Sequence, residues 1–316
     1  MKKTILIIII LCLFVGCSSE QQPAIKTENA LIISLNILDS TITFYNEQED
    51  KVITWKLDHP FKDAVLLNYD EILFMHPKNN QAFIYQLSTG QQIASWEIGK
   101  GMEKVIVYND TVYFSNQANN SVDLYSLNGQ KQTEVQVEGK PFLLLPHENK
   151  LFVSLYNKNK MTVIDLSHLN VTNTFSTDEK VVDGFMNENK LWLGGHGQGE
   201  HIQENVILYD ITSGEEFFHI PAGTMPIGFA SHGQYVYVIS HGSNQLFKIN
   251  MKTYKIESTK TIGPNPFSIV YYHDSLYVDL YDNNKLLKID PTDLTILKEI
   301  DVGEGPFQLL IRNEGT

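Results

Sequence analysis

Cysteine is nearly absent from this chain of 316 residues, and both cysteines, Cys12 and Cys17, lie at the extreme N-terminus. The sequence after Cys17 therefore contains no thiol. This excludes a disulfide framework, a thiol nucleophile and a cysteine-ligated zinc site from the body of the protein.

Basic residues are also scarce, with 24 Lys and Arg against 37 Asp and Glu and a formal net charge of −13. An acidic surface repels a phosphate backbone, which argues against nucleic acid as a partner. Common catalytic signatures are missing as well: there is no G-x-S-x-G elbow, P-loop, H-E-x-x-H motif or dinucleotide-binding fingerprint.

One uninterrupted apolar run of 11 residues, 5–15, follows the positively charged residues 2–3. It is too short to cross a bilayer as a helix and has the length of the hydrophobic region of a signal peptide. The run ends in FVGC (residues 14–17), which resembles the lipobox of bacterial lipoproteins. In that motif a small residue precedes a cysteine that is lipidated and becomes the new N-terminus. Phe14 departs from the pattern, because the family usually has Leu there.

The resemblance implies a signal peptide over residues 1–16 and a lipid anchor on Cys17, which would hold the protein on the outer side of the bacterial cell membrane. Two acyl chains on one cysteine give stable anchoring. The polar residues that follow have no strand pattern, so residues 17–29 are predicted to be a lipidated cysteine and a tether. The alternative is an ordinary secretory signal with an incidental cysteine.

The remaining chain, residues 30–316, is organised by an internal repeat that is clearest near the C-terminus. Residues 226–265 and 266–305 align over 40 positions without a gap. The second unit contains the short runs FSIVYY, SLYVDLY, KLLKID and ILKEIDV, separated by Asp, Asn, His and Gly. Four strands in about 40 residues are typical of one blade of a β-propeller.

The repeat can be followed backwards to count the blades. The predicted blade starts are spaced by 40, 39, 40, 45, 40 and 40 residues and lie at Lys62, Met102, Pro141, Val181, Pro226, Pro266 and Pro306. Six complete four-stranded units precede residue 306, and residues 30–58 supply only three more strands. The missing strand is PFQLLI, residues 306–311. We therefore predict an all-β, seven-bladed propeller of four-stranded antiparallel blades, closed by pairing of the C-terminal strand with the N-terminal blade.

Three features carry a resemblance to a known family: YVIS at residues 237–240, the Ile289-Asp290 pair and IDVGEGPF at residues 300–307. They resemble bacterial YVTN-type seven-bladed propellers. The resemblance covers nearly the whole mature chain and is strongest in the last three blades. It implies the fold and an extracytoplasmic setting, but no single chemistry, because propellers serve as binding proteins, scaffolds and enzymes.

One blade is longer than its neighbours by five residues, and the excess lies in residues 194–201. This loop is rich in glycine and contains His196, Glu200 and His201. Two imidazoles and a carboxylate could bind a divalent metal, which makes these three residues a candidate metal site. The spacing matches no strong zinc motif, and a polar insertion without a ligand is the alternative.

Two rings of residues are predicted to meet at one mouth of the central channel. Tyr156, His196, His241 and Tyr281 occupy one repeat position in four consecutive blades. A second ring is formed by the third residue of each blade: Ala64, Lys104, Leu143, Asp183, Gly228, Ser268 and Gln308. Lys104 and Asp183 are the charged members of this ring. We expect the two rings to form a ligand-binding site, or, as the alternative, to satisfy backbone groups and channel water.

Two functional classes fit these observations. The first is a binding or scaffold module for an envelope protein or a small ligand. The second is an enzyme, such as a metal-dependent lyase, hydrolase or oxidoreductase, that works at the channel mouth.

The lipid anchor gives the first testable prediction. Replacement of Cys17 by Ser should release the protein from membranes into the soluble or secreted fraction, because the other cysteine, Cys12, lies within the predicted signal peptide and the mature chain would then have no cysteine to carry the acyl chains. Fractionation followed by mass spectrometry of the N-terminal peptide would check this. A wild-type protein that is soluble and unacylated would contradict it.

Overall fold

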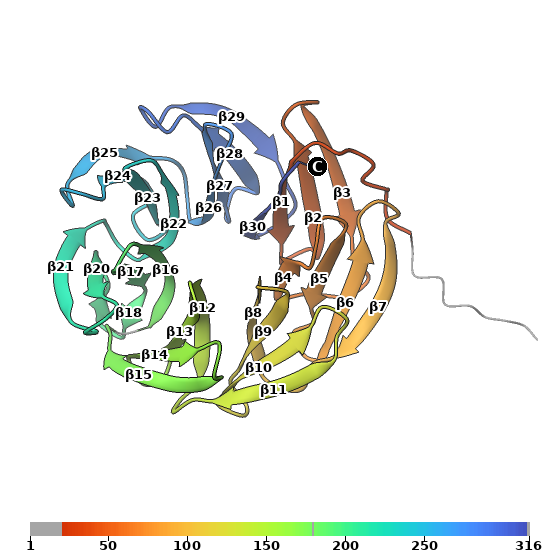
Figure 1. Ribbon diagram of the computed structural model, residues 1–316. Coiled ribbons are helices and arrows are strands. Elements are labelled where there is room, and N and C mark those ends of the chain that lie inside the picture. The colour runs from red at the N-terminus through yellow and green to blue at the C-terminus, as the bar shows by residue number, and fades with distance from the viewer. Residues whose placement is uncertain (1–20, 179, 315–316) are drawn as a thin grey trace, which may run out of the picture.

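The protein is a ring of seven β-sheets around a central channel (Figure 1), as described by a computed structural model that covers residues 21–178 and 180–314. The predicted leader and Cys17 lie outside the described residues. The predicted all-β, seven-bladed propeller is confirmed. No helix within these two ranges is long and apolar enough to cross a membrane.

Each blade has four antiparallel strands, which are arranged side by side in order from the channel to the outer rim. The innermost strands, in blade order 1 to 7, are β30 (Pro306–Arg312), β4 (Asp63–Leu66), β8 (Met102–Tyr108), β12 (Pro141–His147), β16 (Val181–Asn187), β22 (Pro226–His232) and β26 (Pro266–Tyr272). The second strands are β1 (Leu31–Asn36), β5 (Glu71–Met75), β9 (Thr111–Asn116), β13 (Lys150–Leu155), β17 (Lys190–Gly195), β23 (Tyr235–Ser240) and β27 (Ser275–Leu280).

The outer half of each blade follows the same order. The third strands are β2 (Thr41–Asn46), β6 (Gln81–Gln86), β10 (Ser121–Ser126), β14 (Lys160–Asp165), β20 (Asn205–Asp210), β24 (Gln245–Asn250) and β28 (Lys285–Ile289). The outermost strands are β3 (Lys51–Lys56), β7 (Gln91–Glu97), β11 (Lys131–Gln136), β15 (Asn170–Ser176), β21 (Glu216–Pro221), β25 (Ile256–Thr261) and β29 (Ile296–Asp301). Six of the seven predicted blade starts coincide with the first residue of an innermost strand.

Turn chemistry explains why the repeat is so regular. In six blades the last residue of the loop between second and third strands has a positive φ, between 50° and 59°. Five of these residues are Asn, which tolerates the left-handed region better than other residues with a side chain. The six are Ser40, Asn80, Asn120, Asn159, Asn244 and Asn284.

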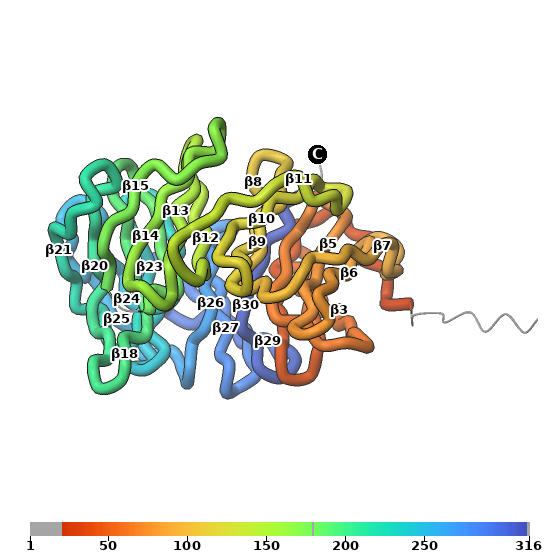
Figure 2. The backbone as a smooth tube through the Cα atoms, turned by 90° about the horizontal axis from the view of Figure 1, so that it is seen from below, coloured from red at the N-terminus to blue at the C-terminus, as the bar shows by residue number. Residues whose placement is uncertain are grey.

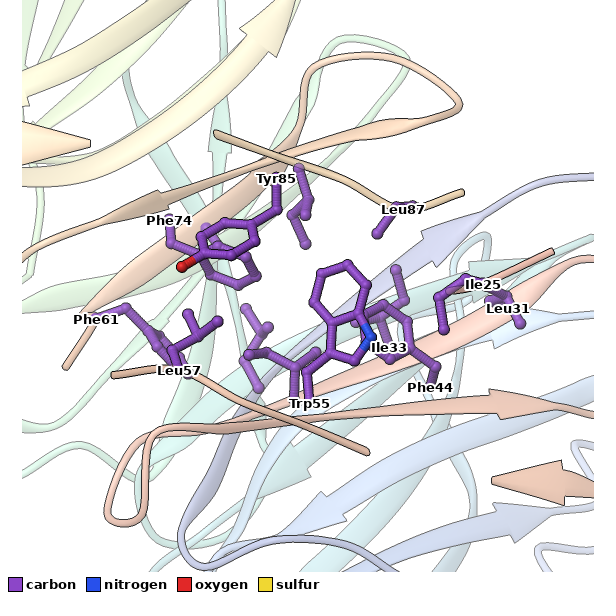
Figure 3. Packing of buried hydrophobic residues seen from close by; sticks show 14 residues of the cluster. Ile25, Leu31, Ile33, Phe44, Trp55, Leu57, Phe61, Phe74, Tyr85 and Leu87 are labelled. Atoms are coloured by element: carbon purple, nitrogen blue, oxygen red, sulfur yellow. The ribbon is translucent and has the colours of Figure 1, made fainter. Parts of the chain in front are cut away.

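The hydrophobic core lies between blades, because each sheet must cover the face of the next. Strands β1 and β2 are buried at every position, whereas β3 is mostly exposed. Figure 3 shows the layer between blades 1 and 2, where Trp55 packs edge-on against Phe44 with ring centroids 4.8 Å apart. All three tryptophans are buried, as expected of core residues.

The ring is closed by β30, which pairs antiparallel with β1 from Leu31↔Arg312 to Asn36↔Pro306. The predicted closure is therefore present. The Arg312 guanidinium, which is buried, donates to the carbonyl oxygens of Thr27 and Asn29 at 2.7 and 2.8 Å. These bonds tie the C-terminal strand to the segment that precedes β1.

Residues 21–29, predicted to be part of a tether, are held against blades 1 and 2. The backbone N–H groups of Gln22 and Ile25 donate to Gly90 and Leu87, and the Trp55 indole donates to the Pro23 carbonyl at 2.7 Å. Ile25 is buried in the core between the two blades. The burial of Ile25 and these hydrogen bonds therefore dock the segment on the ring.

Closure by β30 gives the second prediction. Deletion of residues 306–316 should lower the melting temperature by ~10 °C or more and promote aggregation. A buried Leu or Ile is worth about 1.5–3 kcal/mol, and 1 kcal/mol shifts the melting temperature of a large domain by about 2–4 °C. The deletion also exposes the edge of β1. Deletion of residues 313–316 alone is the control, and thermal melts of both chains provide the measurement. Unchanged stability of the longer deletion would contradict closure by β30.

Candidate functional site

A cavity of about 300 Å³ lies at the mouth of the channel, between the innermost strands. Its apolar wall is formed by aromatic and aliphatic residues from six blades and includes Phe142, Val182, Ile227, Phe267 and Phe307. Its polar lining groups are Asp63, Lys104, Asp183, His196, Ser268 and Gln308. A mostly apolar cavity with a few convergent polar groups is typical of small-molecule sites.

The four predicted mouth residues occupy equivalent places because one backbone hydrogen bond recurs in their blades. The N–H of each donates to the carbonyl of the residue just before the innermost strand. The pairs are Tyr156 to Lys140 (2.9 Å), His196 to Lys180 (3.4 Å), His241 to Met225 (3.2 Å) and Tyr281 to Asn265 (3.0 Å). Of the four side chains, only His196 lines the cavity.

The other three side chains form a layer behind the cavity wall. Tyr156 packs on Phe142 with ring centroids 5.4 Å apart, and Tyr281 packs on Phe267 at 5.6 Å. His241 contacts Phe267 edge-on at 6.0 Å. These contacts position the rings that face the cavity, so Tyr156, His241 and Tyr281 support the wall without lining it.

The two histidines lie side by side, with ring centroids 4.9 Å apart. Both ring nitrogens of His241 have partners, since Nδ1 is 2.9 Å from Asn265 Oδ1 and Nε2 is 3.1 Å from the Met225 sulfur. His196 Nε2 is buried and has no hydrogen-bond partner among the described residues. Burial lowers the pKa of His196, and the electrostatic effects of His241 and Lys180 lower it further.

The candidate metal set of His196, Glu200 and His201 is not assembled. The inserted residues form a small hairpin, β18 (Gly197–Gln198) and β19 (His201–Ile202), which projects from one face of the ring (Figure 2). Gln198 pairs with His201 in this hairpin, and both Glu200 and His201 are exposed near its tip. His196 instead lines the cavity. No group of three or more His, Cys, Asp or Glu side chains within the described ranges could hold a metal ion.

The third-position ring requires a correction in blade 2, where the member is Asp63 and not Ala64. In blade 6 the third-position residue Gly228 pairs with Ile239. Met75 is the equivalent of Ile239 in blade 2, and it pairs with Asp63. The hairpin between β4 and β5 is one residue longer than its counterpart, which shifted the predicted register. Sequence reasoning therefore missed Asp63, a buried acid at the channel.

Third-position side chains connect neighbouring blades. In four places one accepts a hydrogen bond from the fourth-position N–H of the next blade. Asp63 accepts from Val105 at 2.8 Å, Ser268 from Leu309 at 3.0 Å and Gln308 from Ala64 at 3.2 Å. The fourth, Asp183, accepts from Phe229. The structural role that was the alternative for this ring is thus present at these positions.

The charged groups of the cavity are concentrated in blades 2, 3 and 5. Lys104 Nζ lies 3.7 Å from Asp63 Oδ1. Burial raises the pKa of the Asp63 carboxyl, and Lys104 partly opposes this effect. Burial likewise raises the pKa of Asp183 to about 7, against the opposing effects of the Gly184 N–H, Lys104 and the Phe229 N–H.

Comparisons with known proteins support the fold alone. No family model and no curated protein matches the chain. A functionally unknown protein from Desulfotomaculum acetoxidans has a TM-score of 0.72 at 10% identity over 90% of this chain and 99% of its own. Hydrazine synthase from Kuenenia stuttgartiensis has a TM-score of 0.68 at 13% identity, over 81% and 91%. AztD from Citrobacter koseri has a TM-score of 0.64 at 13% identity, over 89% and 97%.

Asp183 gives the third prediction. Its carboxyl should titrate near pH 7, whereas an unfolded Asp titrates near pH 4. A raised pKa in the folded state means that its contribution to the free energy of unfolding falls as the pH rises from about 4 to about 7. When the pH rises from 5 to 8, the free energy of unfolding should therefore fall less in the Asp183→Asn variant than in the wild type.

Two measurements check this: the carboxyl ¹³C shift of Asp183 against pH, and denaturant unfolding of both proteins at the two pH values. Titration of Asp183 near pH 4, with parallel stability profiles, would contradict the prediction.

Proposed function

We propose that this protein is a membrane-anchored extracytoplasmic lipoprotein whose propeller binds a small ligand at the channel mouth. One observation carries the binding role. Two buried polar atoms that have no hydrogen-bond partner among the described residues, Asp63 Oδ1 and His196 Nε2, belong to side chains that line the same cavity.

Unpaired buried polar atoms are uncommon because each costs about 1–3 kcal/mol. Their presence in two side chains of one cavity supports a site where a bound molecule supplies the missing partners. The cavity volume of about 300 Å³ is at the lower end of the range for ligand pockets. A small ligand fits this concave site better than a partner protein does.

The support for anchoring comes from the sequence before the described residues. The apolar run of residues 5–15 and the lipobox-like residues 14–17 favour lipidation of Cys17. Residue 22 is already bonded to blade 2, so few residues would separate the lipid from the ring. The protein would thus present its channel close to the outer surface of the membrane.

The binding role predicts the behaviour of a double variant. Ligand-observed NMR with a mixture of fragments of about 8–15 heavy atoms should detect binding to the wild type. His196→Ala combined with His241→Ala should abolish it, because one change removes a cavity contact and the other removes the support of Phe267. Folding should be intact, since both residues follow strands and lie outside the inter-blade core.

The control is His273→Ala, in the turn between β26 and β27 at the opposite end of its blade. Its fragment binding should equal that of the wild type. Survival of binding in the double variant, or its loss in the control, would show that the mouth is not the binding site.

A further inference from the structure

When Asp63 and Asp183 are both ionised, the cavity has an unmatched negative charge. Its charged lining residues are two carboxylates, Asp63 and Asp183, and one ammonium group, Lys104. The other lysine nearby, Lys62, is paired with Glu103 at 3.0 Å. With both acids ionised, Lys104 can balance only one of them, so the site has room for one further positive charge.

The carboxylates of the cavity can accept further hydrogen bonds, so they can bind donor groups of a ligand. One oxygen of Asp63, Oδ2, accepts the Val105 N–H at 2.8 Å. The other, Oδ1, has Lys104 Nζ only at 3.7 Å, which is too long for a hydrogen bond. Asp63 is 1% exposed, so water cannot readily solvate this atom. A ligand N–H group would satisfy it once the Asp63 side chain turns toward the cavity that it lines.

The wall of the cavity is also suited to a positive charge. Three phenylalanine rings, Phe142, Phe267 and Phe307, line it. Aromatic faces attract cations, and the ammonium of Lys104 already lies 5.9 Å from the centre of the Phe142 ring. An anion in the same place would face two carboxylates in a poorly solvated site, which is costly. A divalent metal would need several oxygen or nitrogen ligands, and the described residues contain no suitable group of three.

From this arrangement we infer that the ligand is a small organic cation, an amine on an apolar body, with its N–H groups at Asp63 and Asp183 and its body against the three phenylalanines. This inference rests on the proposed binding function and specifies the class of ligand. The volume of about 300 Å³ limits the ligand to a small molecule.

Three probes of nearly equal shape test the sign of the charge: 2-phenylethylamine, 2-phenylethanol and 3-phenylpropionate. Titration calorimetry with the wild-type protein at pH 8 should show that the amine binds at least tenfold more tightly than the alcohol, and that the carboxylate does not bind. Asp63→Asn and Asp183→Asn should each weaken binding of the amine tenfold or more, and binding of the neutral alcohol much less. In both variants the Asn side-chain oxygen can still accept one backbone N–H, which preserves the link between blades.

The matched control is Asp110→Asn, which removes the same charge at an exposed turn between β8 and β9. Its backbone φ of 56° is acceptable to Asn, so the amine should bind as it does to the wild type. If the alcohol or carboxylate binds as tightly as the amine, the inference is wrong but the binding site stands. Amine binding that is insensitive to both cavity variants, or absent, also overturns it. Failure of the binding function itself is shown separately, by fragment binding that persists in the His196/His241 double variant.

Discussion

The pairing of β30 with β1 is the contact on which the rest of the structure depends. A propeller blade has two apolar faces, and each is buried only when a neighbour lies against it. Without β30, blade 1 would have three strands, an open edge and no contact with the channel. The same strand contributes Phe307 and Gln308 to the cavity, so closing the ring also completes the site.

The channel mouth combines two tasks in one set of positions. Third-position side chains that can accept a hydrogen bond hold the next blade, as Asp63, Ser268 and Gln308 do. Positions filled by Leu143 and Gly228 cannot accept one, and Lys104 supplies a positive charge instead. These differences between the blades concentrate charge in blades 2, 3 and 5. The cavity therefore has charged groups within an otherwise mostly apolar wall.

Both candidate roles of the inner ring are therefore compatible. A carboxylate has two oxygens, and a bond to a backbone N–H uses only one of their lone pairs. Asp63 shows this division most clearly, with Oδ2 committed to Val105 and Oδ1 without a hydrogen-bond partner. A residue that stabilises the ring can thus also bind a ligand. For this reason the variants that test binding keep an acceptor at these positions.

The sequence alone determined the number of blades, the first residue of six of the seven innermost strands and the way the ring closes. These properties are local: they follow from alternating apolar residues, from Asn turns such as Asn244 and Asn284, and from a period near 40. The same local pattern placed Tyr156, His196, His241 and Tyr281 at equivalent backbone positions. One extra residue in a single hairpin was enough to misplace the register of blade 2 and to hide Asp63.

Only the tertiary structure decided which side chains share a space. It separated His196 from Glu200 and His201, because a two-strand hairpin carries the last two away from the channel. It docked residues 21–29 on blades 1 and 2 through Ile25 and the Trp55 indole, contacts between segments that are distant in the chain. It also added Asp63 to Lys104 and Asp183, which the repeat register had already placed at one mouth of the channel. Burial and charge balance at this cavity depend on contacts between different blades, which the repeat register does not specify.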